Sequence, residues 1–231
     1  MILLSLALLA LPQAAAPAER RYAVTDFDRV LVEGPVAVEL VTGRPSSAAA
    51  YGAQNALDRV TVDVQGTTLR VRPKRSAWGA AAQGRQAPVR VRLTTRSLRS
   101  ARVLGSGSLT LTGARGLGLD LGVDGAGQLE ASGLTVDTLS LSLSGNGRMD
   151  LAGTAAQVRA RLQGSGAIDA EALRARGLQL YSDGSGRVAM TVHGPATVAA
   201  SGLGKVDLSG RPSCTLTGPG AAQVRCASDQ R

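Results

Sequence analysis

Residues 139–151 read Leu-Ser-Leu-Ser-Leu-Ser-Gly-Asn-Gly-Arg-Met-Asp-Leu. Apolar and polar residues alternate on both sides of the Gly145-Asn146-Gly147 triplet, and this alternation is typical of a β-strand with one buried face. Glycine adopts positive φ without steric cost, so two glycines that flank one residue favour a sharp turn. The stretch therefore predicts a strand, a tight corner and a second strand.

The same arrangement recurs along the second half of the chain. Its Gly-x-Gly triplets are Gly105-Ser106-Gly107, Gly125-Ala126-Gly127, Gly145-Asn146-Gly147, Gly164-Ser165-Gly166, Gly184-Ser185-Gly186, Gly202-Leu203-Gly204 and Gly218-Pro219-Gly220. The first glycines of successive triplets are 20, 20, 19, 20, 18 and 16 residues apart. This regular spacing indicates a stack of structural repeats.

Two apolar columns follow the triplets. Two places after the second glycine stand Leu109, Leu129, Met149, Ile168, Val188, Val206 and Ala222, and four places after it stand Leu111, Ala131, Leu151, Ala170, Met190, Leu208 and Val224. A single coil cannot bury its own apolar face, whereas a stack of coils buries a continuous column. We therefore predict an all-β fold, a right-handed parallel β-helix built from coils of about 20 residues with Gly-x-Gly corners. A propeller is the alternative, but its blades usually need roughly 40 residues.

The chain begins with an apolar segment, residues 1–11, followed by Pro12 and an alanine-rich stretch that ends at Ala18. An apolar core of about ten residues is short for a membrane span, which needs about 20, and a small-x-small exit is typical of a secretory signal. We predict a signal peptide over residues 1–18 and a mature protein that is periplasmic or secreted and not transmembrane. A buried hydrophobic helix is the alternative interpretation.

Residues 22–227 are predicted to form a single β-helical domain, with an N-terminal strand section (22–104) and a Gly-x-Gly repeat section (105–227). Alternating strand patterns occur at residues 30–32, 36–41, 60–64, 69–72 and 89–93. Residues 43–58 and 73–88 are rich in Gly, Pro, Ser and Ala and are predicted to be long loops or a short helix. Aromatic residues make up only 2% of the chain, so the core must consist of aliphatic side chains and alanine.

The order of motifs supports a resemblance to a known family. The motifs are Phe27, Val30-Leu31-Val32-Glu33-Gly34, Leu69-Arg70-Val71, Leu98, Val103-Leu104-Gly105-Ser106-Gly107 and the later Gly-Ser-Gly corners. Over roughly residues 24–226, the chain resembles the putative auto-transporter adhesin head GIN domain family. The resemblance implies a secreted or periplasmic bacterial β-helical domain of undetermined activity.

The positive charge is concentrated in the N-terminal half. Residues 1–115 hold 16 Lys and Arg against 7 Asp and Glu, whereas residues 116–231 hold 10 of each. The densest positions are Arg70, Arg72, Lys74, Arg75, Arg85, Arg90, Arg92, Arg96, Arg99 and Arg102. Such a surface attracts polyanions, so the expected partner is an anionic envelope component, a lipid headgroup or a polysaccharide, rather than nucleic acid. Because 24 of the 26 basic residues are Arg, a compositional bias is the alternative explanation.

Within this region, we predict a binding site at Arg72, Lys74, Arg75 and Trp78. The only tryptophan of the chain stands beside three positive charges, and its amphipathic ring suits contact with a sugar face or a lipid interface. The alternative is that the ring folds back and covers the core.

The sequence contains few of the residue types and motifs that catalytic sites use. The one histidine, His193, precedes Gly194-Pro195 and is interpreted as a turn residue, so a histidine metal cluster and a Ser-His-Asp relay are not expected. The triplets do not continue as the Gly-x-Gly-x-x-Gly loop that binds dinucleotides. We therefore expect no cofactor and no metal, and we predict an exported, non-enzymatic envelope or adhesion-type binding or structural module.

One set of side chains supports an alternative function. Glu130, Asp150 and Asp169 occupy the same outward position in successive coils, where neighbours would lie roughly 5 Å apart. Carboxylates at this spacing could hold Ca²⁺ or act on a polysaccharide, as in a carbohydrate-active β-helix enzyme. Three cations stand two places earlier in strands of the same face and favour a salt-bridged, solvated surface instead; they are Arg148, Arg187 and Lys205.

The only two cysteines, Cys214 and Cys226, lie in the last coil. An even count in an exported chain favours a disulfide. Both residues have the parity of inward positions, on either side of the Gly218-Pro219-Gly220 corner. We predict that they form a disulfide that closes the open end of the β-helix, and two buried free thiols are the alternative.

Overall fold

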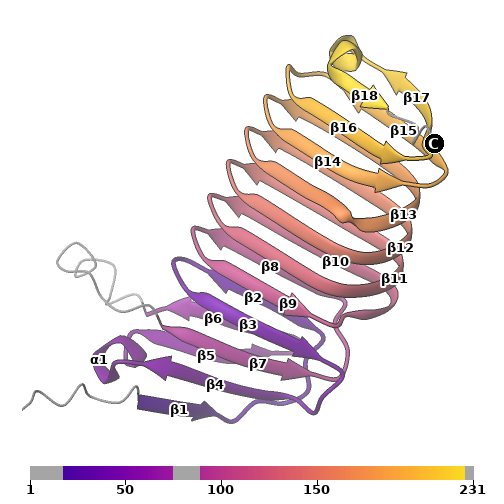
Figure 1. The fold of residues 1–231 in the computed structure, drawn as a ribbon. Coiled ribbons are helices and arrows are strands. Elements are labelled where there is room, and N and C mark those ends of the chain that lie inside the picture. The colour runs from indigo at the N-terminus through magenta and orange to yellow at the C-terminus, as the bar shows by residue number, and fades with distance from the viewer. Residues whose placement is uncertain (1–17, 75–88, 227–231) are drawn as a thin grey trace, which may run out of the picture.

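The computed structural model describes residues 18–74 and 89–226, and they form a stack of β-coils (Figure 1). The strands are β1 (Ala18–Tyr22), β2 (Arg29–Glu33), β3 (Ala37–Thr42), β4 (Ser47–Gly52), β5 (Val60–Gln65), β6 (Thr68–Pro73), β7 (Arg90–Thr95), β8 (Ser100–Gly105), β9 (Ser108–Thr112), β10 (Arg115–Gly125), β11 (Gln128–Gly145), β12 (Arg148–Gly164), β13 (Ala167–Gly184), β14 (Arg187–Val192), β15 (Pro195–Ala200), β16 (Lys205–Gly210), β17 (Ser213–Thr217) and β18 (Val224–Cys226). The described helices are α1 (Gln54–Leu57) and the 3₁₀ helix η2 (Pro219–Gln223). None of the helices within the described ranges is long and apolar enough to span a membrane.

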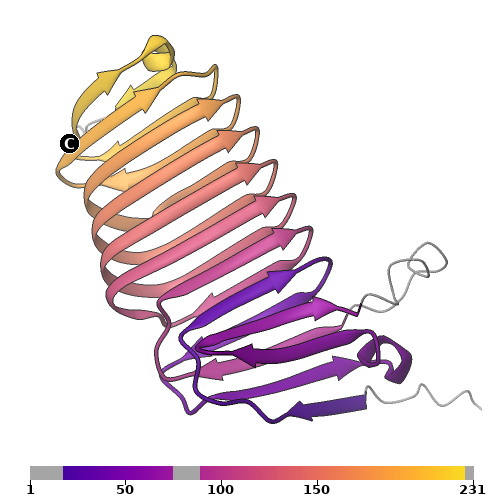
Figure 2. The same cartoon turned by 180° about the vertical axis from the view of Figure 1, so that it is seen from behind.

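Successive coils pair in parallel, as the glycine spacing predicts. Leu129 is the register partner of Met149, and Met149 is the register partner of Ile168. The front and back views both show the strands of neighbouring coils side by side along the stack (Figures 1 and 2). The predicted parallel β-helix is therefore confirmed.

Each coil contributes one strand segment to each of two faces. We call the face formed by the segments that lead into the triplets, such as residues 139–145, the lead-in face; it includes β2, β6, β8, β10, β15 and β17. We call the face formed by the segments that follow the triplets, such as residues 128–131, the lead-out face; it includes β3, β7, β9, β14, β16 and β18. The long strands β11, β12 and β13 belong to both faces because they bend from one to the other.

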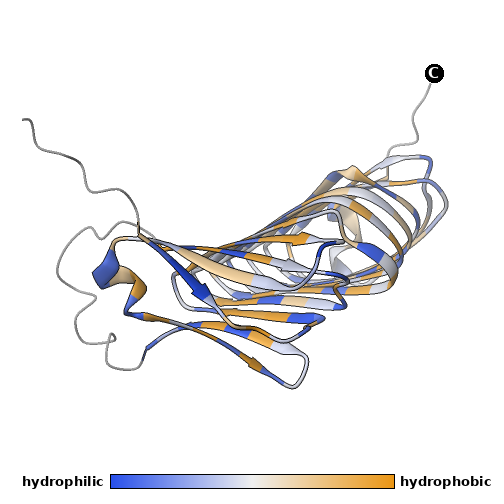
Figure 3. Ribbon diagram, turned by 90° about the horizontal axis from the view of Figure 1, so that it is seen from below, coloured by the Kyte–Doolittle hydropathy of each residue, from blue (hydrophilic) through white to orange (hydrophobic). Residues whose placement is uncertain are grey.

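The hydrophobic core fills the interior of the β-helix, called the bore here, between the two faces. Leu129, Met149, Ile168 and Val188 are each at most 1% exposed, so the first predicted column is stacked inside. Burial of one such aliphatic side chain contributes roughly 1.5–3 kcal/mol to the free energy of folding. In Figure 3 hydrophobic and hydrophilic residues alternate along the strands, as expected for strands with one buried face. Ala222 is the exception to the predicted column, because it lies exposed in η2 instead of in a strand.

In most triplets both glycines lack room for a side chain, since a Cβ on Gly145 would stand 2.6 Å from the carbonyl oxygen of Gly125, and the first glycine also needs positive φ. The first glycine adopts positive φ, as at Gly145 (104°) and Gly164 (108°). The second glycine has no room for a side chain: a Cβ on Gly147 would stand 2.6 Å from the carbonyl oxygen of Gly127 in the coil below. Gly202 departs from this rule, since its φ is not positive and Leu203 beside it is 82% exposed.

A second corner returns the chain from the lead-out face to the lead-in face. Its glycines, Gly113, Gly133 and Gly153, have φ values of 82°, 67° and 139°. The strands continue through this corner with a shift of register between Ala131 and Leu134. Each coil therefore has two corners, of which the Gly-x-Gly pattern marks only one.

The N-terminal end is closed by antiparallel strands. β4 pairs with β1 and with β7, and β5 pairs with β6. The five strands predicted from alternation in residues 22–104 correspond to β2, β3, β5, β6 and β7. The prediction of a loop or a short helix over residues 43–58 was wrong for β4, whose Ala48-Ala49-Ala50 core has low intrinsic strand propensity and is held in the sheet by its two neighbours. β1 begins at Ala18, before residue 22, where the domain was predicted to begin.

Candidate functional site

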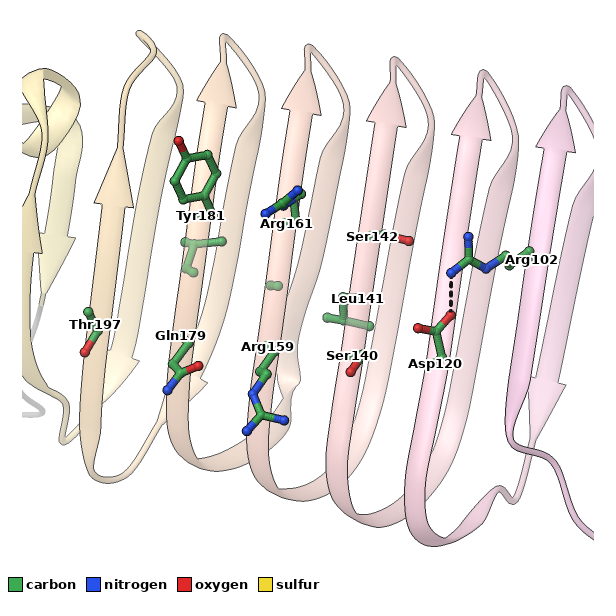
Figure 4. Close-up of a pocket in the computed structure, with 12 residues that line it drawn as sticks. Arg102, Asp120, Ser140, Leu141, Ser142, Arg159, Arg161, Gln179, Tyr181 and Thr197 are labelled. Carbon is green, nitrogen blue, oxygen red and sulfur yellow. Dashed lines mark hydrogen bonds and ion pairs between the residues drawn. The ribbon is translucent and has the colours of Figure 1, made fainter.

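A shallow groove of about 550 Å³ lies on the lead-in face, over β10, β11, β12 and β13 (Figure 4). Its lining residues are Arg102, Asp120, Ser140, Leu141, Ser142, Arg159, Ala160, Arg161, Gln179, Leu180, Tyr181 and Thr197. Leu141, Ala160 and Leu180 are inward positions of the core, so the polar side chains of the groove are those that point away from the bore.

The register of the coils arranges these polar side chains in two rows. The first row is Asp120, Ser140, Arg159, Gln179 and Thr197. The second row is Arg102, Gly122, Ser142, Arg161 and Tyr181. The surface is hollow where short residues of β10 and β11 stand between the long side chains of β8 on one side and of β12 on the other.

The charges of the groove are compensated at one end only. Arg102 forms an ion pair with Asp120 at 3.1 Å, and Asp120 also accepts a 3.4 Å hydrogen bond from the hydroxyl of Ser100. Across the groove, Arg161 lies over the ring of Tyr181. Within the described part of the chain, Arg159 and Arg161 have no carboxylate at ion-pair distance. Two exposed guanidinium groups are therefore available to an anion.

Arg72 and Lys74, the predicted binding residues that the structure describes, do not line this groove. Arg72 is on β6 and faces Asp63 at 3.5 Å, and the backbone N–H of Lys74 donates to the carbonyl oxygen of Arg59 at 2.7 Å. Arg75 and Trp78 lie outside the described residues.

Much of the basic N-terminal surface is engaged in ion pairs. Arg92 pairs with Glu39, Arg96 with Asp26 and Arg99 with Asp28, at 2.9, 3.4 and 3.2 Å. The hydrogen bond from Arg92 to Glu39, together with their Coulomb attraction, raises the pKa of Arg92 above its ordinary value. Arg92, Arg96 and Arg99 are therefore less available to an anion than the sequence suggests.

The carboxylate row is brought together on the lead-out face, away from the groove. Glu130, Asp150 and Asp169 are successive register partners, as their spacing predicts. Asp150 lies 3.8 Å from Arg148, and Asp207 of the same row lies 3.7 Å from Arg187. Among residues 18–74 and 89–226, no group of three or more His, Cys, Asp or Glu side chains is placed to hold a metal ion.

The disulfide and the histidine lie near the C-terminal end of the stack. Cys214 on β17 is bonded to Cys226 on β18, with an S–S distance of 2.06 Å, so the predicted disulfide is confirmed. Since β17 belongs to the lead-in face and β18 to the lead-out face, the bond joins the two faces of the last coil. His193 is exposed in the turn between β14 and β15.

The sequence prediction missed Arg159, Arg161 and Tyr181. A usable signal was present, because each stands at an outward position of the alternating run that leads into a triplet. The register of the coils, which sets Arg161 beside Tyr181, brings the three into one groove.

The chain matches a family model and several solved structures. The model for "Putative auto-transporter adhesin, head GIN domain" matches residues 26–212. A putative adhesin from Bacteroides fragilis has a TM-score of 0.79 at 21% identity, covering 89% of this chain and 94% of its own. A putative lipid binding protein from Parabacteroides distasonis has a TM-score of 0.71 at 18% identity, covering 92% and 97%. These likenesses concern the fold.

A putative adhesin from Parabacteroides merdae has the same fold, with a TM-score of 0.63 at 17% identity and coverage of 93% of this chain and 97% of its own. No curated protein matches the chain. The family match spans most of the β-helix, including the strands that form the groove. The chain therefore belongs to the auto-transporter adhesin head GIN domain family.

Proposed function

We propose that this protein is an exported, non-enzymatic binding module of the cell envelope that takes an anionic ligand in the groove on its lead-in face. The observation that carries the proposal is the pair of exposed arginines, Arg159 and Arg161, set beside a floor of short side chains. A guanidinium forms two parallel hydrogen bonds with a carboxylate, sulfate or phosphate group, which makes arginine well suited to such ligands.

Export is supported by three features that agree. The disulfide between Cys214 and Cys226 persists in oxidising compartments such as the periplasm or the extracellular space. The family and the similar structures described as putative adhesins point in the same direction. Residues 1–18 have the composition of a secretory signal. We place the mature protein in the periplasm or outside the cell.

The shape of the groove favours binding of an extended or peripheral ligand over enclosure of a small molecule. Drug-sized ligands are usually buried over most of their surface in a concave, largely apolar pocket. This groove lies on a flat sheet, and Arg159 and Tyr181 are exposed in it. Binding therefore depends on charge and on contact with the ring of Tyr181.

The proposal is tested by titrating polygalacturonate, an anionic polymer, and dextran, a neutral one, into the protein in a calorimeter. The R159A/R161A variant should bind polygalacturonate roughly tenfold more weakly than the wild type, because each exposed charge contact contributes up to about 1 kcal/mol. The R148A/R187A variant removes two arginines from the lead-out face and should bind as the wild type does. Equal binding by both variants, or a wild type that binds neither polygalacturonate nor phosphatidylglycerol vesicles, would contradict the proposal.

A carbohydrate-active enzyme is the second candidate, and the observation that favours it is the in-register row of Glu130, Asp150 and Asp169. The ion pair of Asp150 with Arg148 favours a structural role for the row instead. The two functions are separated by assaying the wild type and the E130A/D150A/D169A variant on uronate-containing and neutral polysaccharides with Ca²⁺ present. Turnover that the triple variant loses would establish the enzyme and overturn the binding module.

A further inference from the structure

The hollowed surface of the lead-in face continues beyond the groove toward the N-terminal end. A second hollow of about 450 Å³ lies over β2, β6 and β8 and is lined in part by Arg29, Thr68 and Ser100. It shares Arg102 and Asp120 with the groove. The two hollows are therefore parts of one surface that runs along the axis of the stack.

The two outward rows of the groove extend over this whole surface. Arg29 is the register partner of Ser100 and Ser100 of Asp120, so Arg29 continues the row of Arg159. Leu31 joins the other row, because it is the partner of Arg102 on one side and of Arg70 on the other. We call these two rows, from β6 to β13, the arginine lane.

The arginine lane has a strong excess of positive charge. Its cations are Arg29, Arg70, Arg102, Arg159 and Arg161, and its one carboxylate among the described residues is Asp120, which gives a net charge of 5 − 1 = +4. The cations are spread from β6 to β12 and are not gathered at one point. A single small anion could reach only a few of them.

A third outward row borders the lane on the side of the Gly-x-Gly corner. In register it holds Glu33, Leu104, Asp124, Ser144, Gln163 and Asp183. Carboxylates repel an anionic ligand, so the three in this row disfavour its spread beyond the lane. On the lead-out face the positive charges of Arg148 and Arg187 are compensated instead, because both residues stand beside carboxylates of the neighbouring row.

The length of the lane fits a polymer that lies along the stack. Arg29 on β2 and Arg161 on β12 are separated by four strand spacings, which is about 19 Å at roughly 4.8 Å per spacing. Beyond Arg161, Tyr181 offers a ring that is 46% exposed, and the C–H face of a sugar packs well on such a ring. A lipid headgroup would occupy one or two strand spacings only.

We propose that the arginine lane binds one extended acidic polysaccharide along the axis of the stack. This inference rests on the proposed function, because the groove is the C-terminal part of the lane. It adds the class of ligand, its direction and a contribution from Arg29, which lies outside the groove.

The test compares galacturonate oligomers of two lengths, a dimer and a decamer, by calorimetry. The dimer is shorter than the distance from Arg29 to Arg161, whereas the decamer is longer. The wild type should bind the decamer at least about tenfold more tightly than the dimer. Added salt should weaken the binding of the decamer more steeply than that of the dimer, because more charge contacts are screened. The R29A variant should lose up to about fivefold in affinity for the decamer.

The matched control is R44A, which removes an exposed arginine from the turn between β3 and β4, outside the lane. R44A should bind the decamer as the wild type does. Equal affinity of the wild type for both oligomers, or an R29A variant equal to R44A, would overturn the lane and leave the proposed function intact. Binding of phosphatidylglycerol vesicles without binding of either oligomer would also overturn it.

Discussion

Arg161 lies over the ring of Tyr181, with its guanidinium carbon 5.4 Å from the ring centroid. The two residues are register partners on β12 and β13, so the parallel stacking of the coils brings them together. A cation over an aromatic face at an exposed site gains about 0.5–1 kcal/mol and holds the side chain in place. The ring therefore orients one of the two arginines on which the proposed site depends.

We expect Y181A to weaken polygalacturonate binding about two- to fivefold, because it removes both the ring under Arg161 and a surface for a sugar. Y181F keeps the ring and should bind within about twofold of the wild type. Calorimetric titration of both variants checks this. A loss of affinity in Y181F as large as that in Y181A would instead assign the effect to the phenolic hydroxyl.

The corner glycines are expected to be essential for stability. G145V places a branched side chain at a φ of 104°, and G147A places a Cβ 2.6 Å from the carbonyl oxygen of Gly127. Each should lower the free energy of unfolding by about 1–3 kcal/mol or more. G118A is the matched control, since a Cβ there meets nothing within 4 Å, and it should stay within about 0.5 kcal/mol of the wild type. Urea unfolding curves that give G147A and G118A the same free energy of unfolding would contradict this account of the corner.

The disulfide is expected to stabilise the last coil. Closing a loop with a sequence separation of 12 residues contributes about 3 kcal/mol in the chain-entropy model. In C214A/C226A, amide hydrogen exchange should become faster in β16, β17 and β18 and stay unchanged in β11 and β12, because each coil of a stack contacts only its neighbours. Unchanged exchange in the last coil would refute a closing role. The non-reduced wild type should also be two hydrogens lighter than the reduced chain.

A buried hydroxyl joins β7 to the segment before β2. Thr95 is 1% exposed, and its hydroxyl donates to the carbonyl oxygen of Phe27, with that of Ser97 at 3.2 Å as a second acceptor. T95V keeps the shape of the side chain and leaves the carbonyl without this donor, so it should cost about 1–3 kcal/mol. T110V on the exposed side of β9 is the control and should cost less than about 0.5 kcal/mol. Equal melting temperatures for the two variants would show that the bond contributes nothing.

The repeat section was predictable because one local sequence pattern determines its fold. The triplet Gly145-Asn146-Gly147 and the alternation around it indicate both the corner and the inward column. The second corner, at Gly113, Gly133 and Gly153, was missed although its glycines are also 20 residues apart. It lacks the second glycine, because the strands pass through this corner with a bulge instead of a sharp turn.

The groove was less predictable, because it depends on the pairing of side chains from different coils. Arg159 and Arg161 are ordinary outward residues in the sequence, and only their position beside the short side chains of β11 places them in a groove. The strand β4 was missed for a similar reason, since its pairing with β1 and β7 outweighs its alanine-rich composition.

The most direct test of the binding account is an arginine footprint. Phenylglyoxal modifies exposed guanidinium groups, and mass spectrometry of the peptides gives the rate at each arginine with and without bound polygalacturonate. The account predicts that the polymer protects Arg159 and Arg161 on the lead-in face and leaves Arg148 and Arg187 on the lead-out face reactive. Protection confined to Arg148 and Arg187, or equal protection of both faces, would contradict it.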